Sequence, residues 1–70
     1  MIALSKAESG HEYLVTWMMG TIAPFLRNGY DLKENTVVHV SRRFRDGSAI
    51  IKYGGKRTAI GADTAYAVKL

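Results

Sequence analysis

The chain has 70 residues, of which 47% are hydrophobic and 23% charged, and it contains no cysteine. This length predicts a single domain over residues 1–70, and the missing cysteines exclude disulfide bridges and thiolate metal sites. The net charge of +4 is compatible with nucleic acid, an anionic membrane surface or an acidic protein as a partner.

The first predicted strand follows a short lead-in, residues 4–10, that ends in a Ser-Gly turn. Residues 11–17 alternate with the period of a strand, and this places Tyr13, Val15 and Trp17 on the inward side. The two following methionines are expected to extend the strand as far as the next glycine.

A short helix is predicted over residues 21–28. Thr21 is placed to cap its first turn, and Gly29 is placed to end it in a left-handed conformation. A polar turn over residues 33–35 follows, in which Asn35 takes a positive φ. The buried stripe of the helix is predicted to comprise Ile22, Phe25, Leu26 and Gly29.

A meander of three strands is predicted over residues 36–61. Asp46-Gly47 and Gly54-Gly55 read as two-residue turns, which require the positive φ that glycine adopts freely. Loops this short set the register by counting. The expected pairs are Phe44 with Ala49, Arg42 with Ile51 and Val40 with Tyr53 in the first hairpin, then Ile51 with Thr58 and Ala49 with Ile60 in the second.

The inner face of this meander comes out almost wholly apolar, with Val38, Val40, Phe44, Ala49, Ile51, Tyr53 and Ile60. A helical turn over residues 62–65 and a last strand over residues 66–70 complete the chain. The sequence therefore predicts a mainly β fold, a small SH3-like barrel of about five antiparallel strands. One short helix lies between strands 1 and 2, a helical turn precedes the last strand, and the first and last strands pair.

Several segments together carry a family resemblance, which extends over nearly the whole chain. They are residues 4–10, residues 25–30, then Thr36, Val38, Val40, Gly47, Gly55, Ala59-Ile60 and Ala65. With these features the chain resembles the FeoA family, the small cytosolic components of ferrous iron uptake. It departs from the family pattern at Asn28, at Tyr30 and in the connection 29–36, which is longer than usual and lacks a Pro-Gly turn.

The resemblance implies an accessory role beside FeoB, a membrane permease with a cytosolic GTP-binding domain. It also implies similarity to the SH3-like domain at the C-terminus of diphtheria-toxin-repressor-type metalloregulators. The protein is expected in the cytoplasm, at the inner face of the membrane only through a partner. Neither a secretory signal nor a membrane-spanning segment is predicted, because the longest apolar region, residues 13–26, falls short of the ~20 residues that a span needs.

Catalytic and metal sites are not predicted. His11 and His39 have no second ligand at chelating spacing, and no nucleophile stands beside a base. Gly54-Gly55 lacks the following Lys-Ser/Thr of a phosphate loop. The chain is therefore expected to be no enzyme, to carry no cofactor and to bind no small-molecule substrate.

Two surfaces are candidates for partner binding. The corner at the end of the helix contributes Leu26, Gly29 and Tyr30, and a charge introduced at Leu26 or Tyr30 is expected to weaken binding without unfolding the barrel. The outer face of the meander contributes Arg43, Lys52 and Arg57. A simpler reading of this basic face is a solubilising surface, and a simpler reading of the corner is a lid on the barrel.

The predicted function is a non-enzymatic accessory protein that binds the cytosolic part of a FeoB-type permease and modulates transport. One alternative is a regulatory module related to metalloregulator C-terminal domains, acting on a repressor or on a second copy of itself. Another is a small basic barrel that binds nucleic acid. The predicted core positions of most aromatic residues disfavour the second alternative, because base stacking needs exposed rings.

Overall fold

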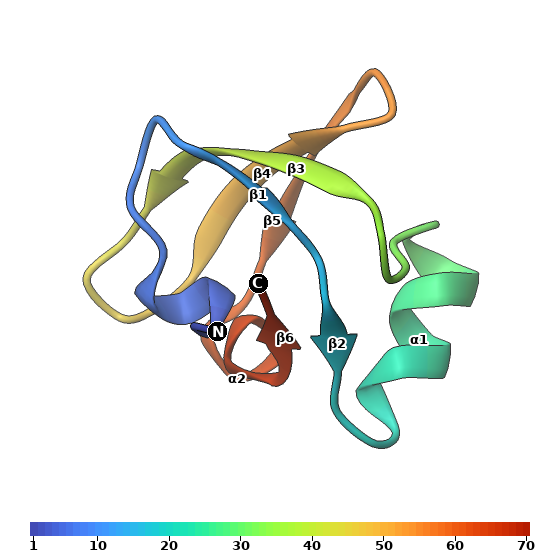
Figure 1. Ribbon diagram of the computed structural model, residues 1–70. Helices are drawn as coiled ribbons and strands as arrows, with labels where there is room; N and C mark the ends of the chain where they lie inside the picture. Colours follow the sequence, from blue (N-terminus) through green and yellow to red (C-terminus); the bar gives the residue numbers. More distant parts are fainter.

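Six short strands and two helices make up the computed structural model, which describes residues 1–70 (Figure 1). The elements in chain order are the 3-10 turn η1 (Leu4–Lys6), β1 (Glu12–Leu14), β2 (Trp17–Met18), α1 (Ile22–Gly29), β3 (Val37–Arg43), β4 (Ala49–Tyr53), β5 (Lys56–Ile60), α2 (Ala62–Ala67) and β6 (Val68–Lys69).

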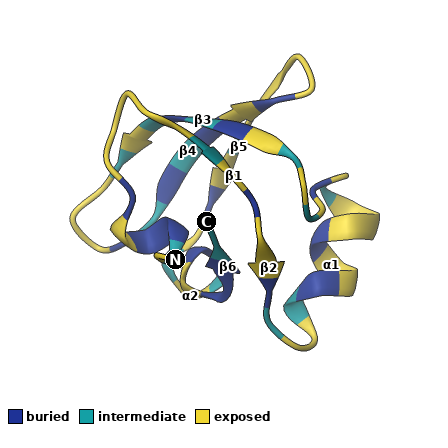
Figure 2. Cartoon of the chain, viewed as in Figure 1, coloured by how far each residue is buried: buried dark blue, intermediate teal, exposed yellow.

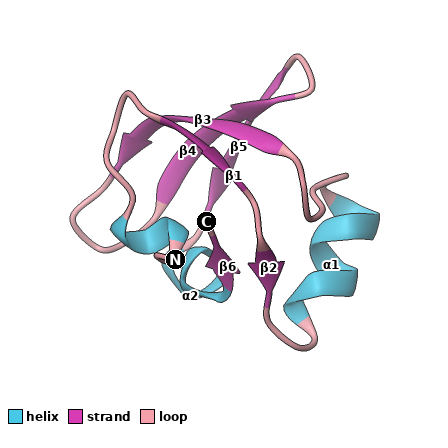
Figure 3. Cartoon of the chain, viewed as in Figure 1, coloured by secondary structure: helices cyan, strands magenta, loops and turns pink.

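The strands form two antiparallel sheets, one of four strands in the order β1-β3-β4-β5 and one that pairs β2 with β6 (Figure 3). Ile2 and Leu70 exchange two backbone hydrogen bonds, so the two termini lie side by side. The predicted mainly β, SH3-like architecture is confirmed, and so is the pairing of the first strand region with the last strand. None of the helices is long and apolar enough to span a membrane.

The predicted first strand is divided between the two sheets. The N–H of Val15 donates to the carbonyl of Thr36, the residue before β3 in the four-stranded sheet. The N–H of Thr16, the next residue, donates to the carbonyl of Lys69 in the other sheet. This change of partner interrupts the alternation. Met18 therefore points inward with 3% exposure, while Trp17 is 50% exposed, and the prediction that Trp17 faces inward is wrong.

The three pairs predicted across the first hairpin are wrong, because its loop has three residues instead of two and a β-bulge at Ser41 shifts the register once more. An extra residue on one strand turns the following side chains to the opposite face. Arg43, rather than Arg42, therefore lies in the row of buried Ala49. The observed pairs are His39 with Lys52, Val40 with Ile51, Arg42 with Ile50 and Arg43 with Ala49.

The loop of this hairpin has three residues, 45–47, instead of the two predicted. The N–H of Phe44 donates to Ser48 O at 2.8 Å, and the N–H of Gly47 donates to Phe44 O at 3.0 Å. Gly47 takes a φ of +97°, the left-handed residue that follows the type I turn in loops of this length. Phe44 consequently lies at the sheet end, 38% exposed, and its predicted core position is wrong.

The second hairpin has the predicted register. Both glycines of its two-residue turn have positive φ, +56° for Gly54 and +77° for Gly55. The observed pairs are Ala49 with Ile60, Ile50 with Ala59, Ile51 with Thr58, Lys52 with Arg57 and Tyr53 with Lys56.

Helix α1 ends differently from the prediction. Gly29 belongs to the helix, and the left-handed conformation falls two residues later, at Asp31 with a φ of +52°. The chain reverses there, and the N–H of Leu32 donates to Leu26 O at 3.1 Å. Asn35 has the predicted positive φ of +71°. Thr21 precedes the helix as predicted, but its side chain makes no capping hydrogen bond.

The core gathers apolar residues from nearly every element (Figure 2). Helix α2 runs to Ala67, two residues beyond the predicted turn, and β6 is correspondingly shorter than predicted. The N-terminal segment, predicted only as a lead-in, supplies a fully buried side chain in Leu4. The largest fully buried side chains are Leu4, Leu26, Leu32, Ile51, Val15, Val38, Val40 and Val68.

Candidate functional site

The corner at the end of α1 is attached to the main sheet by a buried tyrosine. The hydroxyl of Tyr53, a residue 5% exposed on β4, donates to Tyr30 O at 2.6 Å. The ring of Tyr30 lies 5.3 Å from that of Phe25, measured between centroids. Phe25 is 52% exposed, so the corner presents an aromatic pair on a fixed backbone.

Leu26 has no exposed surface and therefore offers nothing for a partner to contact. A charge introduced there would be buried among apolar side chains at a large free-energy cost, so the expectation that the barrel would tolerate it is wrong. Gly29 is exposed and Tyr30 is half-buried. Phe25, predicted as part of the buried stripe, is the apolar side chain that this corner actually exposes.

An ion pair fixes the loop that follows the corner. Arg27 in the last turn of α1 contacts Glu34 with an Nη2 to Oε2 distance of 2.8 Å. Hydrogen bonds from the backbone N–H of Glu34 and from Arg27 hold the pKa of this carboxyl below its ordinary value. The connection between α1 and β3 is thus held by a charged contact as well as by the turn at Asn35.

The outer face of β4 and β5 carries a cationic cluster. Lys52 and Arg57 are directly paired across the two strands, and with Lys56 and Gly55 they line a shallow pocket of about 290 Å³. None of these three cations forms an ion pair, because the carboxylate contacts of the protein are Glu34 with Arg27 and Glu8 with His11. The charges of Lys52 and Arg57 are therefore open to solvent and to any acidic partner, whereas Lys56 is paired with Tyr53 and its Nζ lies 5.3 Å from the centroid of that ring.

Arg43 does not belong to this cationic cluster, in contrast to the prediction. Its Nε donates to Ala7 O at 2.8 Å, its Nη1 donates to Phe44 O at 3.2 Å, and its backbone N–H donates to Ser9 Oγ at 2.9 Å. The bulge has turned it toward the N-terminal segment, which it ties to β3. No sequence signal marks the bulge, since Ser41 fits a regular strand as well.

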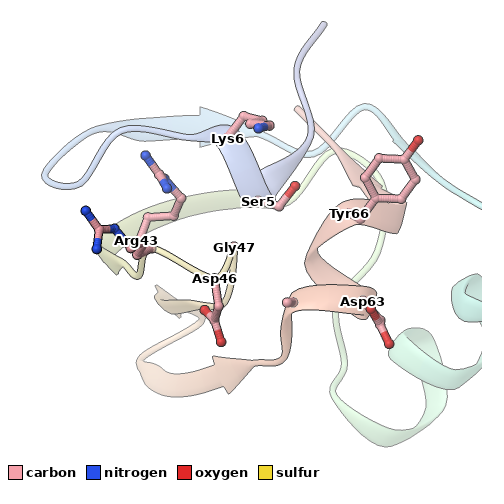
Figure 4. A pocket seen from close by; sticks show the side chains of 9 residues that line it. Ser5, Lys6, Arg43, Asp46, Gly47, Asp63 and Tyr66 are labelled. Carbon is pink, nitrogen blue, oxygen red and sulfur yellow. The ribbon is translucent and has the colours of Figure 1, made fainter.

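A second pocket, of about 310 Å³, lies between η1, the β3–β4 loop and the start of α2 (Figure 4). Its lining mixes both signs of charge, and Gly47 lies so near Ser5 that a Cβ added to the glycine would be 3.2 Å from Ser5 Cβ. Asp46 accepts hydrogen bonds from the hydroxyl and N–H of Ser48, and these lower the pKa of its carboxyl. The lining residues are Ser5, Lys6, Arg43, Arg45, Asp46, Gly47, Ala62, Asp63 and Tyr66.

Exposed apolar side chains also lie outside the corner. Leu14 and Val37 are paired across β1 and β3 and are 46% and 56% exposed. His11 is exposed and His39 is half-buried. The structure contains no group of three or more His, Asp or Glu side chains arranged to hold a metal ion together.

The comparison with solved structures gives a match over nearly the whole chain. The crystal structure of an iron uptake regulatory protein (FeoA) matches with a TM-score of 0.78 and 28% sequence identity, covering 96% of this chain and 89% of that one. No family model and no curated protein matches the sequence. The chain therefore has a FeoA-like fold, and the predicted resemblance is confirmed at that level.

Proposed function

We propose that this chain is a non-enzymatic accessory protein of ferrous iron uptake, which binds the cytosolic part of a FeoB-type permease and modulates transport. The observation that carries the proposal is the FeoA-like fold, with 28% identity over 96% of the chain. In this proposal the protein acts in the cytoplasm and reaches the inner face of the membrane only through its partner.

The corner of α1 suits a contact with such a partner. Phe25 exposes half of a large apolar side chain, and phenylalanine is one of the residue types enriched at the centre of protein–protein interfaces. The hydrogen bond from Tyr53 to Tyr30 holds the corner in place before a partner arrives, which reduces the entropy that binding must overcome.

The proposal is tested by uptake of radioactive ferrous iron in a strain that lacks the gene and grows under iron limitation. The unmodified gene is expected to restore uptake, and Phe25→Glu is expected to restore it only in part. Tyr66→Glu is the matched control, because Tyr66 is an equally exposed aromatic residue, 60% accessible, on the distant helix α2. Thermal unfolding of both purified variants checks that each one folds.

Unchanged uptake in the deletion strain would refute the role in iron uptake. Equal rescue by Phe25→Glu and by the unmodified gene would instead remove the α1 corner from the interface while leaving the role in place. Co-purification that recovers a transcription factor and no permease would favour the regulatory alternative.

A further inference from the structure

Strand β5 is an open edge of the four-stranded sheet. It lies at the end of the order β1-β3-β4-β5 and pairs only with β4. No backbone or side-chain hydrogen bond outside this pairing involves residues 56–60. The strand at the other end of the sheet, β1, is shorter, and the chain passes from it directly into the second sheet. The five residues of β5 are therefore the longer free edge.

The hairpin geometry identifies the backbone groups that are free. In a two-residue hairpin the residues that flank the turn form a hydrogen-bonded pair, and the pairs along the ladder then alternate. Because Tyr53 and Lys56 flank this turn, the N–H and C=O groups of Arg57 and Ala59 point away from β4. Both residues are exposed, so two donors and two acceptors remain for another strand.

Charge determines what can occupy this edge. The side chains of Lys52, Lys56 and Arg57 line the pocket beside it, and none of them contacts a carboxylate. A second copy of the chain would bring the same cations into the pocket, so self-pairing along β5 is opposed by like-charge repulsion. An acidic segment would instead relieve the repulsion that already exists between Lys52 and Arg57.

We propose that the β5 edge binds an extended acidic segment of a partner protein as an added strand. The segment would pair with the backbone of Arg57 and Ala59, and carboxylates at alternate positions would lie on the face of Lys52 and Arg57. This site is distinct from the α1 corner, and the inference goes beyond the proposed function because it holds for any protein that supplies such a segment.

The probe is a synthetic eight-residue peptide in which glutamate alternates with threonine or valine, titrated into the full ¹⁵N-labelled chain. The largest changes in amide chemical shift are expected at Arg57 and Ala59. A second peptide of identical sequence is N-methylated at alternate residues, which keeps its charge but removes its backbone donors on one edge. It is expected to bind at least about fivefold more weakly, because each lost hydrogen bond contributes about 1 kcal/mol.

Protein variants separate local charge from net charge. Arg57→Glu is expected to weaken binding of the unmodified peptide by about fivefold or more. Lys33→Glu changes the net charge equally at an exposed position in the connection between α1 and β3 and is expected to leave the affinity within about twofold. Because Arg57 faces Lys52, its replacement by glutamate should not destabilise the barrel, and thermal unfolding of both variants checks this.

Three results would overturn the inference: equal affinity for the two peptides, shift changes confined to another surface, or equal weakening by the two variants. Tighter binding of a single-stranded oligonucleotide than of the peptide, with shifts on the same face, would also overturn it and assign the cationic cluster to nucleic acid.

Discussion

Replacing Tyr53 with phenylalanine removes the hydroxyl that joins the α1 corner to the main sheet, and nothing else. That hydroxyl donates to Tyr30 O at 2.6 Å, and Tyr53 is only 5% exposed. A hydrogen bond of this kind contributes about 0.5–1.5 kcal/mol to stability, and the part-buried Tyr30 carbonyl left without its donor adds a desolvation cost. We therefore expect Tyr53→Phe to lower the free energy of unfolding by about 1–2 kcal/mol.

Thermal unfolding measures this effect directly. For a domain of 60–100 residues, 1 kcal/mol corresponds to about 4–8 °C in Tm, so the melting temperature should fall by roughly 4–16 °C. Tyr66→Phe is the matched control, because the exposed hydroxyl of Tyr66 makes no hydrogen bond in the structure. It should change Tm by no more than about 2–4 °C.

The same variant tests whether the corner depends on the sheet. In ¹⁵N NMR spectra the largest shift changes should fall on Tyr30 and its neighbours at the end of α1, and the second hairpin should change little beyond Tyr53. A Tm equal to that of Tyr66→Phe would refute the reasoning, because it would mean that water satisfies the Tyr30 carbonyl as well as the Tyr53 hydroxyl does. Shift changes spread evenly through the protein would contradict the local role.

Three other changes have defined outcomes. Ser41→Ala should raise Tm by a few degrees or leave it unchanged, because the buried Ser41 hydroxyl has no hydrogen-bond partner; a clear fall in Tm would show that the hydroxyl is bonded. Gly47→Ala should cost about 1–2 kcal/mol in urea unfolding, since Gly47 has a φ of +97° and an added Cβ would lie 3.2 Å from Ser5 Cβ; an unchanged midpoint would contradict this. Hydrogen bonds from Ser48 lower the pKa of the Asp46 carboxyl below its ordinary value of 3.8. They therefore stabilise the fold at pH values above 3.8, and this stabilisation disappears as the pH falls through the lower folded-state pKa. The Tm difference between the protein and Asp46→Ala should therefore shrink as pH falls below about 4, and a difference independent of pH would refute the assignment.

Local turn chemistry is sufficient to predict the second hairpin. Gly54-Gly55 admits the positive φ values that a two-residue turn requires, and with that loop length the pairing of Lys52 with Arg57 follows by counting. The same reasoning, applied to alternating apolar residues, correctly places Val40 and Ile51 in the core. The mainly β, SH3-like architecture is predictable because each of these signals lies within a few residues of the element that it defines.

The composition of the two candidate partner surfaces depended on tertiary contacts that no local pattern encodes. Arg43 lies outside the cationic cluster because a bulge at Ser41 turns its side chain to the other face of β3. Whether a strand contains such an extra residue depends on how β3 pairs with its neighbours. Trp17 faces solvent because the chain exchanges one sheet for the other just before it. Phe25 is exposed because α1 turns the neighbouring Leu26, and not Phe25, toward the core.

The sequence by itself therefore determined the class of fold, the second hairpin and the excess of basic residues, all of which depend on backbone conformations and charges local to the chain. Only the tertiary structure decided which of those cations lie together, which aromatic ring remains exposed and which strand edge stays unpaired. The physical reason is that a strand reveals its alternation in sequence, whereas its partner, its bulges and its free edge are properties of the assembled sheet.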